Sequence, residues 1–217
     1  DPPEGEGLSQ WQDAKARLVS SLSPLTRENT VRGQYDGYHD VEGVDPHSTV
    51  ETYVAVRLMA DTWRWAGVPI LIRAGKCLPV TATEVTVRFR RPPRDIFGLA
   101  PLPPENELRF RVWPETAVSL TLAGKKPGPT WEPQVEELAF AARPGSDIRP
   151  YDRLIGAALD GDRSLFARQD TVEAAWSIVD PVVGDVVPVH PYAIGTWGPT
   201  EAERLLPHRD FWHDPKR

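Results

Sequence analysis

The sequence predicts an α+β fold: a large, mainly antiparallel β-sheet with helices packed on one face. In the first two thirds of the chain, apolar and polar residues alternate with a period of two, which is typical of strands. Beyond Pro144 the apolar residues recur at helical spacing instead. Strands that precede the helices, rather than alternate with them, favour helices that lie over the sheet. We expect one domain over residues 1–217, built of short elements because 23 prolines interrupt the chain.

The first element is expected to be a helix over residues 8–22 that ends before Pro24 and docks on the main body. Its apolar residues recur at helical spacing: Leu8, Trp11, Ala14, Leu18 and Leu22.

Period-two alternation predicts strands over residues 50–58, 84–90 and 108–113, with further strands at 69–74, 117–122 and 135–141. In the first of these, Val54 and Val56 point one way while Glu51 and Tyr53 point the other. Because the strands follow one another through short turns, we expect an antiparallel sheet with one face buried. The other face carries Arg, Glu and Trp, and such a bare face predicts a homodimer that forms through the sheet.

Two helices are expected next, over residues 151–159 and 170–179. Asp170 occupies the N-cap position of the second helix, with Glu173 three residues later, as in a capping box. Pro181 ends or bends that helix. From about Pro188 we expect an extended arm with one short helix near 201–205.

Composition excludes several classes of protein. A net charge of −6 argues against a nucleic-acid-binding surface. Cys77 is the only cysteine, so no internal disulfide can form and a cytoplasmic location is expected. The first seven residues lack the features of a signal peptide, and no apolar run approaches membrane-spanning length. These residues are acidic and rich in Pro and Gly, and they lead directly into a helix. We therefore expect that the chain starts inside a longer sequence.

The chain carries no recognisable cofactor or metal motif. The glycines Gly5 and Gly7 lack the third glycine of a dinucleotide fingerprint and follow no strand. The segment 70–77 has Ile70 where a phosphate loop needs its first glycine, and Cys77 where it needs Ser or Thr. The five histidines include no pair at i, i+4 spacing. His208, Asp210 and His213 could approach a metal ion, but a solvated tail is the simpler interpretation. We expect neither a metal nor a bound cofactor in this chain.

Lys76 is the best candidate for a functional residue. It follows Gly75 at the end of a predicted strand, where glycine allows the backbone to turn at positive φ. The lysine is then a mobile cation that can hold a phosphate or a sugar hydroxyl. By spacing alone, an ordinary exposed lysine is the simpler interpretation.

Two other groups have plainer interpretations. A basic stripe could bind an anion, but an open sheet face of alternating charge explains it equally: Arg88, Arg90, Arg91 and Arg94. Trp63 and Trp65 are expected to anchor the core or an interface.

Taken together, several segments resemble the carboxy-terminal domain of glucose-6-phosphate dehydrogenases in order and spacing. The longest are 31–35 (VRGQY), 62–69 (TWRWAGVP) and 72–78 (IRAGKCL), and shorter ones lie at 94–97, 106–108, 126–128, 151–155, 166–168, 173–176 and 195–199. The resemblance implies an α+β domain whose sheet also makes a dimer interface. It further implies that Lys76 reaches into the site for glucose 6-phosphate, which the family oxidises with NADP to 6-phosphogluconolactone in the pentose phosphate pathway.

Two positions depart from the family pattern. Thr81 stands where members commonly have a second basic residue, and Trp113-Pro114 stands where many have Gln-Pro. Both changes predict a weaker grip on the substrate, so neither residue is assigned to the site.

The resemblance also implies that the remaining machinery lies elsewhere. The glycine-rich NADP loop, the phosphate-gripping Asp-His-Tyr-x-x-Lys segment and the catalytic histidine belong to the amino-terminal part of the family, so this chain alone is expected to be inactive. The choice between NAD and NADP depends on that part. The alternative is a stand-alone, non-catalytic paralogue that acts as an assembly or regulatory module.

Overall fold

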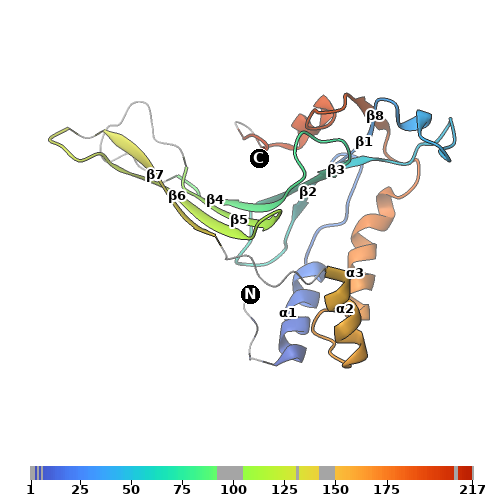
Figure 1. Ribbon diagram of the computed structural model, residues 1–217, viewed down its shortest axis with the longest axis horizontal. Coiled ribbons are helices and arrows are strands. Elements are labelled where there is room, and N and C mark those ends of the chain that lie inside the picture. Colours follow the sequence, from blue (N-terminus) through green and yellow to red (C-terminus); the bar gives the residue numbers. More distant parts are fainter. Residues whose placement is uncertain are drawn as a thin grey trace. The chain divides into compact units, whose positions relative to one another are not determined.

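The computed structural model describes residues 3, 5, 7–91, 105–130, 132–141, 150–207 and 210–216. They form two compact units, each with its own sheet. The first unit comprises Asp1–Pro79 and Ile148–Trp212, and the second comprises Val80–Asp147 and His213–Arg217. Figure 1 labels the elements of both.

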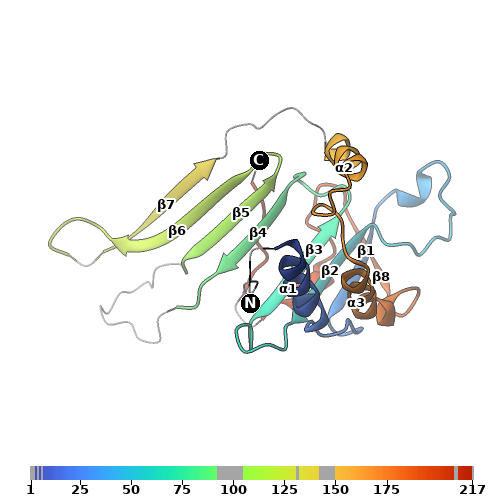
Figure 2. The same ribbon diagram turned by 90° about the horizontal axis from the view of Figure 1, so that it is seen from below.

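The first unit contains a four-stranded sheet in the order β3-β2-β1-β8 (Figure 2). Its strands are β1 (Thr30–Tyr35), β2 (Tyr53–Met59), β3 (Pro69–Gly75) and β8 (Val189–Tyr192). The pairs β1–β2 and β2–β3 are antiparallel, whereas β1–β8 is parallel. The patterns at β2 and β3 are confirmed as strands, whereas β1 was not predicted and β8 lies in the stretch expected to be an extended arm.

Both faces of β2 are covered, although the alternation predicted only one. Val56 and Leu58 pack with Ile178 of α3 (Gln169–Val179). On the opposite side, Tyr53 and Ala55 pack with a different set of residues: Val31, Tyr192, Ala202 and Leu205. The second face is buried because the stretch after Pro188 returns to it, contributing β8 and the 3-10 helix η3 (Thr200–Leu205). The short helix expected near 201–205 is therefore confirmed.

Three helices of this unit match the helical patterns. The helix α1 (Leu8–Ser20) packs against α3, and α2 (Pro150–Leu159) precedes α3 along the chain (Figures 1 and 2). The 3-10 turns η1 (Tyr38–Asp40) and η2 (Asp180–Val182) complete the first unit.

The predicted cap of α3 is wrong. The N-cap residue is Arg168, and Asp170 lies inside the first turn, where its carboxylate accepts a hydrogen bond from the amide of Thr171 at 2.8 Å. The same carboxylate binds the guanidinium of Arg168 at 2.6 Å. A negative charge in the first turn of a helix is favourable there as well.

The second unit is an antiparallel sheet in the order β4-β5-β6-β7. Its strands are β4 (Thr83–Arg88), β5 (Glu107–Trp113), β6 (Ala117–Lys125) and β7 (Pro133–Ala141). Cross-strand neighbours on one face are apolar, as in Val85–Phe110 and Val118–Phe140. Those on the other face are polar, as in Glu84–Arg111.

The apolar face of this second sheet is exposed, contrary to the expectation that it would be the buried one. Phe140 is 71% exposed, Leu138 51% and Val85 54%. The polar face holds the more buried side chains, among them Ser119 at 9%. Contacts from the tail residues 213–216 contribute to this difference, because His213 and Lys216 bind residues on the polar face.

The α+β class and the mainly antiparallel pairing are confirmed, but the strands form two sheets rather than one large sheet. Trp63 is fully exposed, so it is not a core residue.

Two parts of the chain named in the sequence analysis lie outside the described residues: the segment 94–97, which includes Arg94 of the basic stripe, and His208. Among the residues that are described, no helix has the length and apolar character needed to cross a membrane.

Candidate functional site

Lys76 lies one residue beyond β3, in a turn that the first unit holds tightly. The preceding Gly75 has no room for a side chain, because a Cβ there would come within 2.7 Å of the buried ring of Tyr53. The residue at positive φ is Cys77, at +54°, and not Gly75 as the sequence suggested. Gly75 is therefore required for close approach, while the turn itself is made at a residue that rarely adopts this conformation.

Three hydrogen bonds from distant segments hold the backbone of this turn. The amide of Lys76 donates to the carbonyl of Thr52 at 2.8 Å, and the hydroxyl of Tyr192 donates to the carbonyl of Lys76 at 2.8 Å. The amide of Gly195 donates to the carbonyl of Cys77, also at 2.8 Å. The polar backbone groups on both sides of the lysine are thereby satisfied.

The side chain of Lys76 is exposed and makes no hydrogen bond or ion pair with any other residue in the described part of the chain. A lysine cation presents three donors, which suit phosphate oxygens and sugar hydroxyls. The turn therefore offers an uncommitted cation on a fixed backbone.

Two buried tyrosines lie behind the turn. Their ring centroids are 5.5 Å apart, and Tyr53 and Tyr192 are only 1% and 4% exposed. Burial raises the pKa of the Tyr53 hydroxyl to about 12. Burial also raises the pKa of the Tyr192 hydroxyl, against the opposing effect of its hydrogen bond with Thr52. Tyr192 therefore keeps its proton at neutral pH and can donate it to the carbonyl of Lys76.

The end of β3 is also held by its arginine. The guanidinium of Arg73 lies 4.5 Å from the ring centroid of Trp197 and 5.3 Å from that of Trp212. Such cation–π contacts stabilise a packed arrangement by on the order of 1 kcal/mol each. The residues after β8 thus brace the strand that leads to Lys76.

The two positions that depart from the family pattern lie in the second unit. Thr81 is exposed and precedes β4 by two residues. Trp113 ends β5, where it pairs with Thr83, and a cis peptide bond links it to Pro114. Both positions are therefore at the same end of the β4–β7 sheet.

The described residues contain no glycine-rich turn that joins a parallel strand to a helix, as the usual dinucleotide fold requires. In the dinucleotide fold a glycine-rich turn joins a parallel strand to a helix whose N-terminus holds the pyrophosphate. Here the parallel pair is β1 and β8, and each strand is followed by a 3-10 turn, η1 or η3, instead of an α-helix. In the described part of the chain, no group of three His, Cys, Asp or Glu residues is placed to hold a metal ion.

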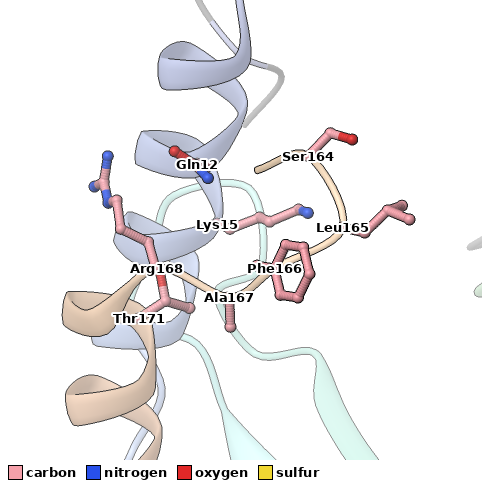
Figure 3. Close-up of a pocket in the computed structure, with 8 residues that line it drawn as sticks. All are labelled: Gln12, Lys15, Ser164, Leu165, Phe166, Ala167, Arg168 and Thr171. Atoms are coloured by element: carbon pink, nitrogen blue, oxygen red, sulfur yellow. The ribbon is translucent and has the colours of Figure 1, made fainter. Parts of the chain in front are cut away.

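A cavity of about 190 Å³ lies between α1 and the segment that precedes α3, away from the Lys76 turn (Figure 3). Two of its polar side chains already have partners: Arg168 binds Asp13 at 2.6 Å, and the hydroxyl of Ser164 binds Asp162 at 2.9 Å. The residues that line it are Gln12, Lys15, Ser164, Leu165, Phe166, Ala167, Arg168 and Thr171. We assign it no role.

Reasoning from the sequence found Lys76 but not the residues that hold it. Thr52, Tyr192 and Gly195 are 24, 116 and 119 positions away from Lys76 along the chain. No local pattern marks them, because Tyr192 falls in a proline-rich stretch that reads as an arm. The Gly-Thr-Trp-Gly-Pro segment at 195–199 was the nearest signal.

The family model and the relatives that are similar to this chain all belong to one family. Residues 1–213 match the family described as "Glucose-6-phosphate dehydrogenase, C-terminal domain". The chain is 41% identical to Glucose-6-phosphate 1-dehydrogenase 1 of Mycobacterium tuberculosis, over 99% of its own length and 46% of the relative's. It is 34% identical to the cytoplasmic isoform of Glucose-6-phosphate 1-dehydrogenase from Solanum tuberosum, covering 97% of the chain and 43% of that protein. The chain thus spans about half the length of the curated relatives it matches.

Two solved structures are similar to the chain as well. The crystal structure of Glucose-6-phosphate 1-dehydrogenase from Mycobacterium avium superposes with a TM-score of 0.90 at 40% identity, over 100% of this chain and 47% of that one. A glucose-6-phosphate dehydrogenase in complex with its substrate glucose-6-phosphate superposes with a TM-score of 0.82 at 30% identity, over 99% of this chain and 47% of that one.

Proposed function

Because the chain belongs to the glucose-6-phosphate dehydrogenase family, as its carboxy-terminal domain, we propose that it is the substrate-binding and dimerising part of a glucose-6-phosphate 1-dehydrogenase. The complete enzyme would oxidise glucose 6-phosphate to 6-phosphogluconolactone with NADP, as the entry to the pentose phosphate pathway. Residues 1–217 would act together as this one domain.

The observation that carries the proposal is the free cation at the end of β3. Lys76 has an exposed ammonium on a backbone fixed by Thr52 and Tyr192. A phosphorylated sugar carries a doubly charged phosphate and several hydroxyls. The phosphate oxygens and the hydroxyl oxygens can each accept a hydrogen bond from an ammonium. A solved relative is a complex with this sugar phosphate.

In this proposal the chain positions the substrate, and the catalytic base and the nicotinamide cofactor are bound by another part of the enzyme. Removal of the C1 hydride requires a base and an oriented nicotinamide. The described residues form no dinucleotide fold, and Thr81, five positions after Lys76 in the sequence, carries no charge. The separate chain would therefore be inactive.

We also propose a cytoplasmic homodimer. The plant relative named as a cytoplasmic isoform and the single cysteine support the location. The exposed apolar face of the β4–β7 sheet supports association, because monomeric proteins rarely expose contiguous apolar surface of this kind.

Replacement of Lys76 by alanine in the complete enzyme tests the proposed site. Loss of a charged hydrogen bond to substrate should raise KM for glucose 6-phosphate by on the order of tenfold to a hundredfold, and lower kcat/KM accordingly. Steady-state kinetics would measure this, with thermal unfolding as a check that the fold is intact. Lys15→Ala, at another exposed lysine of the first unit, should leave both constants unchanged. Unaltered kinetics in Lys76→Ala would remove the lysine from the site.

A second candidate is a non-catalytic module that pairs through its sheet. The observation that favours it is that Thr81 and Trp113 depart from the family pattern, in the unit whose sheet has an exposed apolar face. Sequencing the coding region upstream of residue 1 separates the two functions: an in-frame glycine-rich β-α unit would exclude the module.

A further inference from the structure

We infer that Tyr192 is a positioning residue for Lys76, acting through the backbone of the turn rather than on the substrate. This inference rests on the proposed function of Lys76 in binding glucose 6-phosphate. It assigns a role to a buried hydroxyl on β8, a strand at the opposite edge of the sheet from β3.

The hydroxyl of Tyr192 is one link in a chain of hydrogen bonds that crosses the sheet. The amide of Tyr35 on β1 donates to Oγ1 of Thr52 at 3.0 Å. Oγ1 of Thr52 lies 3.1 Å from Oη of Tyr192, which lies 2.8 Å from the carbonyl oxygen of Lys76. If the hydroxyl of Thr52 donates to that of Tyr192, the hydrogen bonds all run the same way: from the amide of Tyr35, through the two hydroxyls, to the carbonyl of Lys76.

The turn requires such support because Cys77 is held at a φ of +54°. A residue with a side chain keeps this conformation only where its surroundings fix it. The carbonyl of Lys76 immediately precedes Cys77, so the bond from Tyr192 acts on the peptide unit whose orientation sets that φ. Without it, the turn can relax and the direction in which the lysine side chain leaves the backbone is no longer fixed.

A fixed direction matters for a lysine more than for a short side chain. Its four side-chain torsions already cost entropy when the ammonium binds a ligand, and a mobile backbone adds to that cost. Loss of the Tyr192 hydroxyl should therefore weaken substrate binding without removing any group that touches the substrate.

The ring of Tyr192 has a separate, structural role that phenylalanine would preserve. It packs against Tyr53 with centroids 5.5 Å apart, and a Cβ at Gly33 would lie 3.1 Å from its Cδ1. Tyr192→Phe keeps this packing and removes only the hydroxyl.

The test compares Tyr192→Phe, Lys76→Ala and the double variant in the complete enzyme. We expect Tyr192→Phe to raise KM for glucose 6-phosphate by about fivefold and to change kcat by less than about twofold. In the Lys76→Ala background the same substitution should change KM no further, because the group it positions is absent. Tyr35→Phe is the matched control: its ring lies 6.5 Å from that of Tyr192, and its hydroxyl has no hydrogen-bond partner among the described residues.

The outcomes separate this inference from the proposed function. If Lys76→Ala raises KM while Tyr192→Phe does not, the positioning role is wrong and the proposed site stands. If the two effects add in the double variant, Tyr192 acts elsewhere and the inference is again overturned. If Lys76→Ala has no effect, the proposed site fails and the positioning role falls with it. Should Tyr192→Phe not fold, Thr52→Val breaks the same chain of hydrogen bonds and is judged by the same criteria.

Discussion

At the scale of single residues, Glu84 shows how a charge is tolerated inside the second unit. Its side chain is 2% exposed, and its carboxylate accepts hydrogen bonds from Arg111 at 2.5 Å and from His213 at 2.7 Å. Burial by itself would raise the pKa of Glu84, but the bonds from His213 and Arg111 outweigh it and leave the pKa below its usual value. The carboxylate is thus kept ionised by its partners.

This arrangement predicts a pH-dependent stability. Because the pKa of Glu84 is lower in the folded than in the unfolded protein, its stabilisation is complete above the unfolded pKa of about 4.3 and is lost as pH falls through the folded pKa. Glu84→Gln should lower the free energy of unfolding by about 1–3 kcal/mol at neutral pH. The difference from the parent should shrink as the pH falls below about 4.

Urea unfolding at a series of pH values would measure the effect. Glu137→Gln, at an exposed carboxylate of β7, should change stability by less than about 0.5 kcal/mol. A Glu84→Gln variant as stable as the parent at neutral pH would show that the two hydrogen bonds contribute nothing net.

The candidate site itself divides at this scale into a residue that sequence reasoning could find and residues that it could not. Lys76 follows a glycine at the end of an alternating run, and both features are local. The role of Gly75 was misjudged, because the demand on it comes from the ring of Tyr53, which is 22 positions away. Close approach between distant residues leaves no local signature.

At the scale of elements, α3 packs on β2 through one buried aliphatic side chain, Ile178. Ile178 is 7% exposed and packs with Val56 and Leu58 of β2. Its carbonyl also accepts a hydrogen bond from the amide of Leu25 at 2.8 Å. The last turn of the helix therefore joins two parts of the same core.

Ile178→Ala should destabilise the first unit by about 2–4 kcal/mol, because it removes buried methyl groups and leaves a cavity against β2. Val179→Ala, at the neighbouring residue that is 38% exposed, should cost less than about 1 kcal/mol. Chemical denaturation of the two variants measures the difference. Equal losses would mean that α3 is not docked through Ile178.

The elements also show where periodicity is a reliable guide. Runs with a clear period became α1, β2 to β7, α2 and α3. The strand β1 was missed because it contains a charged residue, Arg32, that is buried, with only 5% of its surface exposed. Arg32 binds Glu51 at 2.8 Å and the carbonyl of Val187 at 2.9 Å. Its partners come from distant segments, so its burial could not be read from its own neighbourhood.

At the scale of the whole molecule, the apolar face of the β4–β7 sheet predicts self-association. Val85, Phe110, Val118 and Phe140 form a row across the four strands. A second copy of this chain would bury that row in a symmetric contact.

Phe140→Asp should shift the protein from dimer to monomer, because it places a charge in the middle of the proposed contact. Ala139→Asp introduces the same charge one residue away, on the opposite face of β7, and should leave the dimer intact. Sedimentation velocity over a range of concentrations distinguishes the two. A Phe140→Asp variant that remains dimeric would exclude this face as the interface.

The sequence by itself determined the α+β class, most of the strands and helices, the family resemblance and the position of Lys76. Each of these depends on the spacing of residues close together in the chain. Only the tertiary structure decided that the strands divide into two sheets, that both faces of β2 are covered and that the apolar face of the second sheet is exposed. It also decided that Tyr192 holds the turn of Lys76 from 116 residues away. The physical reason is the same in each case: burial and hydrogen bonding depend on which distant segments meet, and a local period carries no information about that.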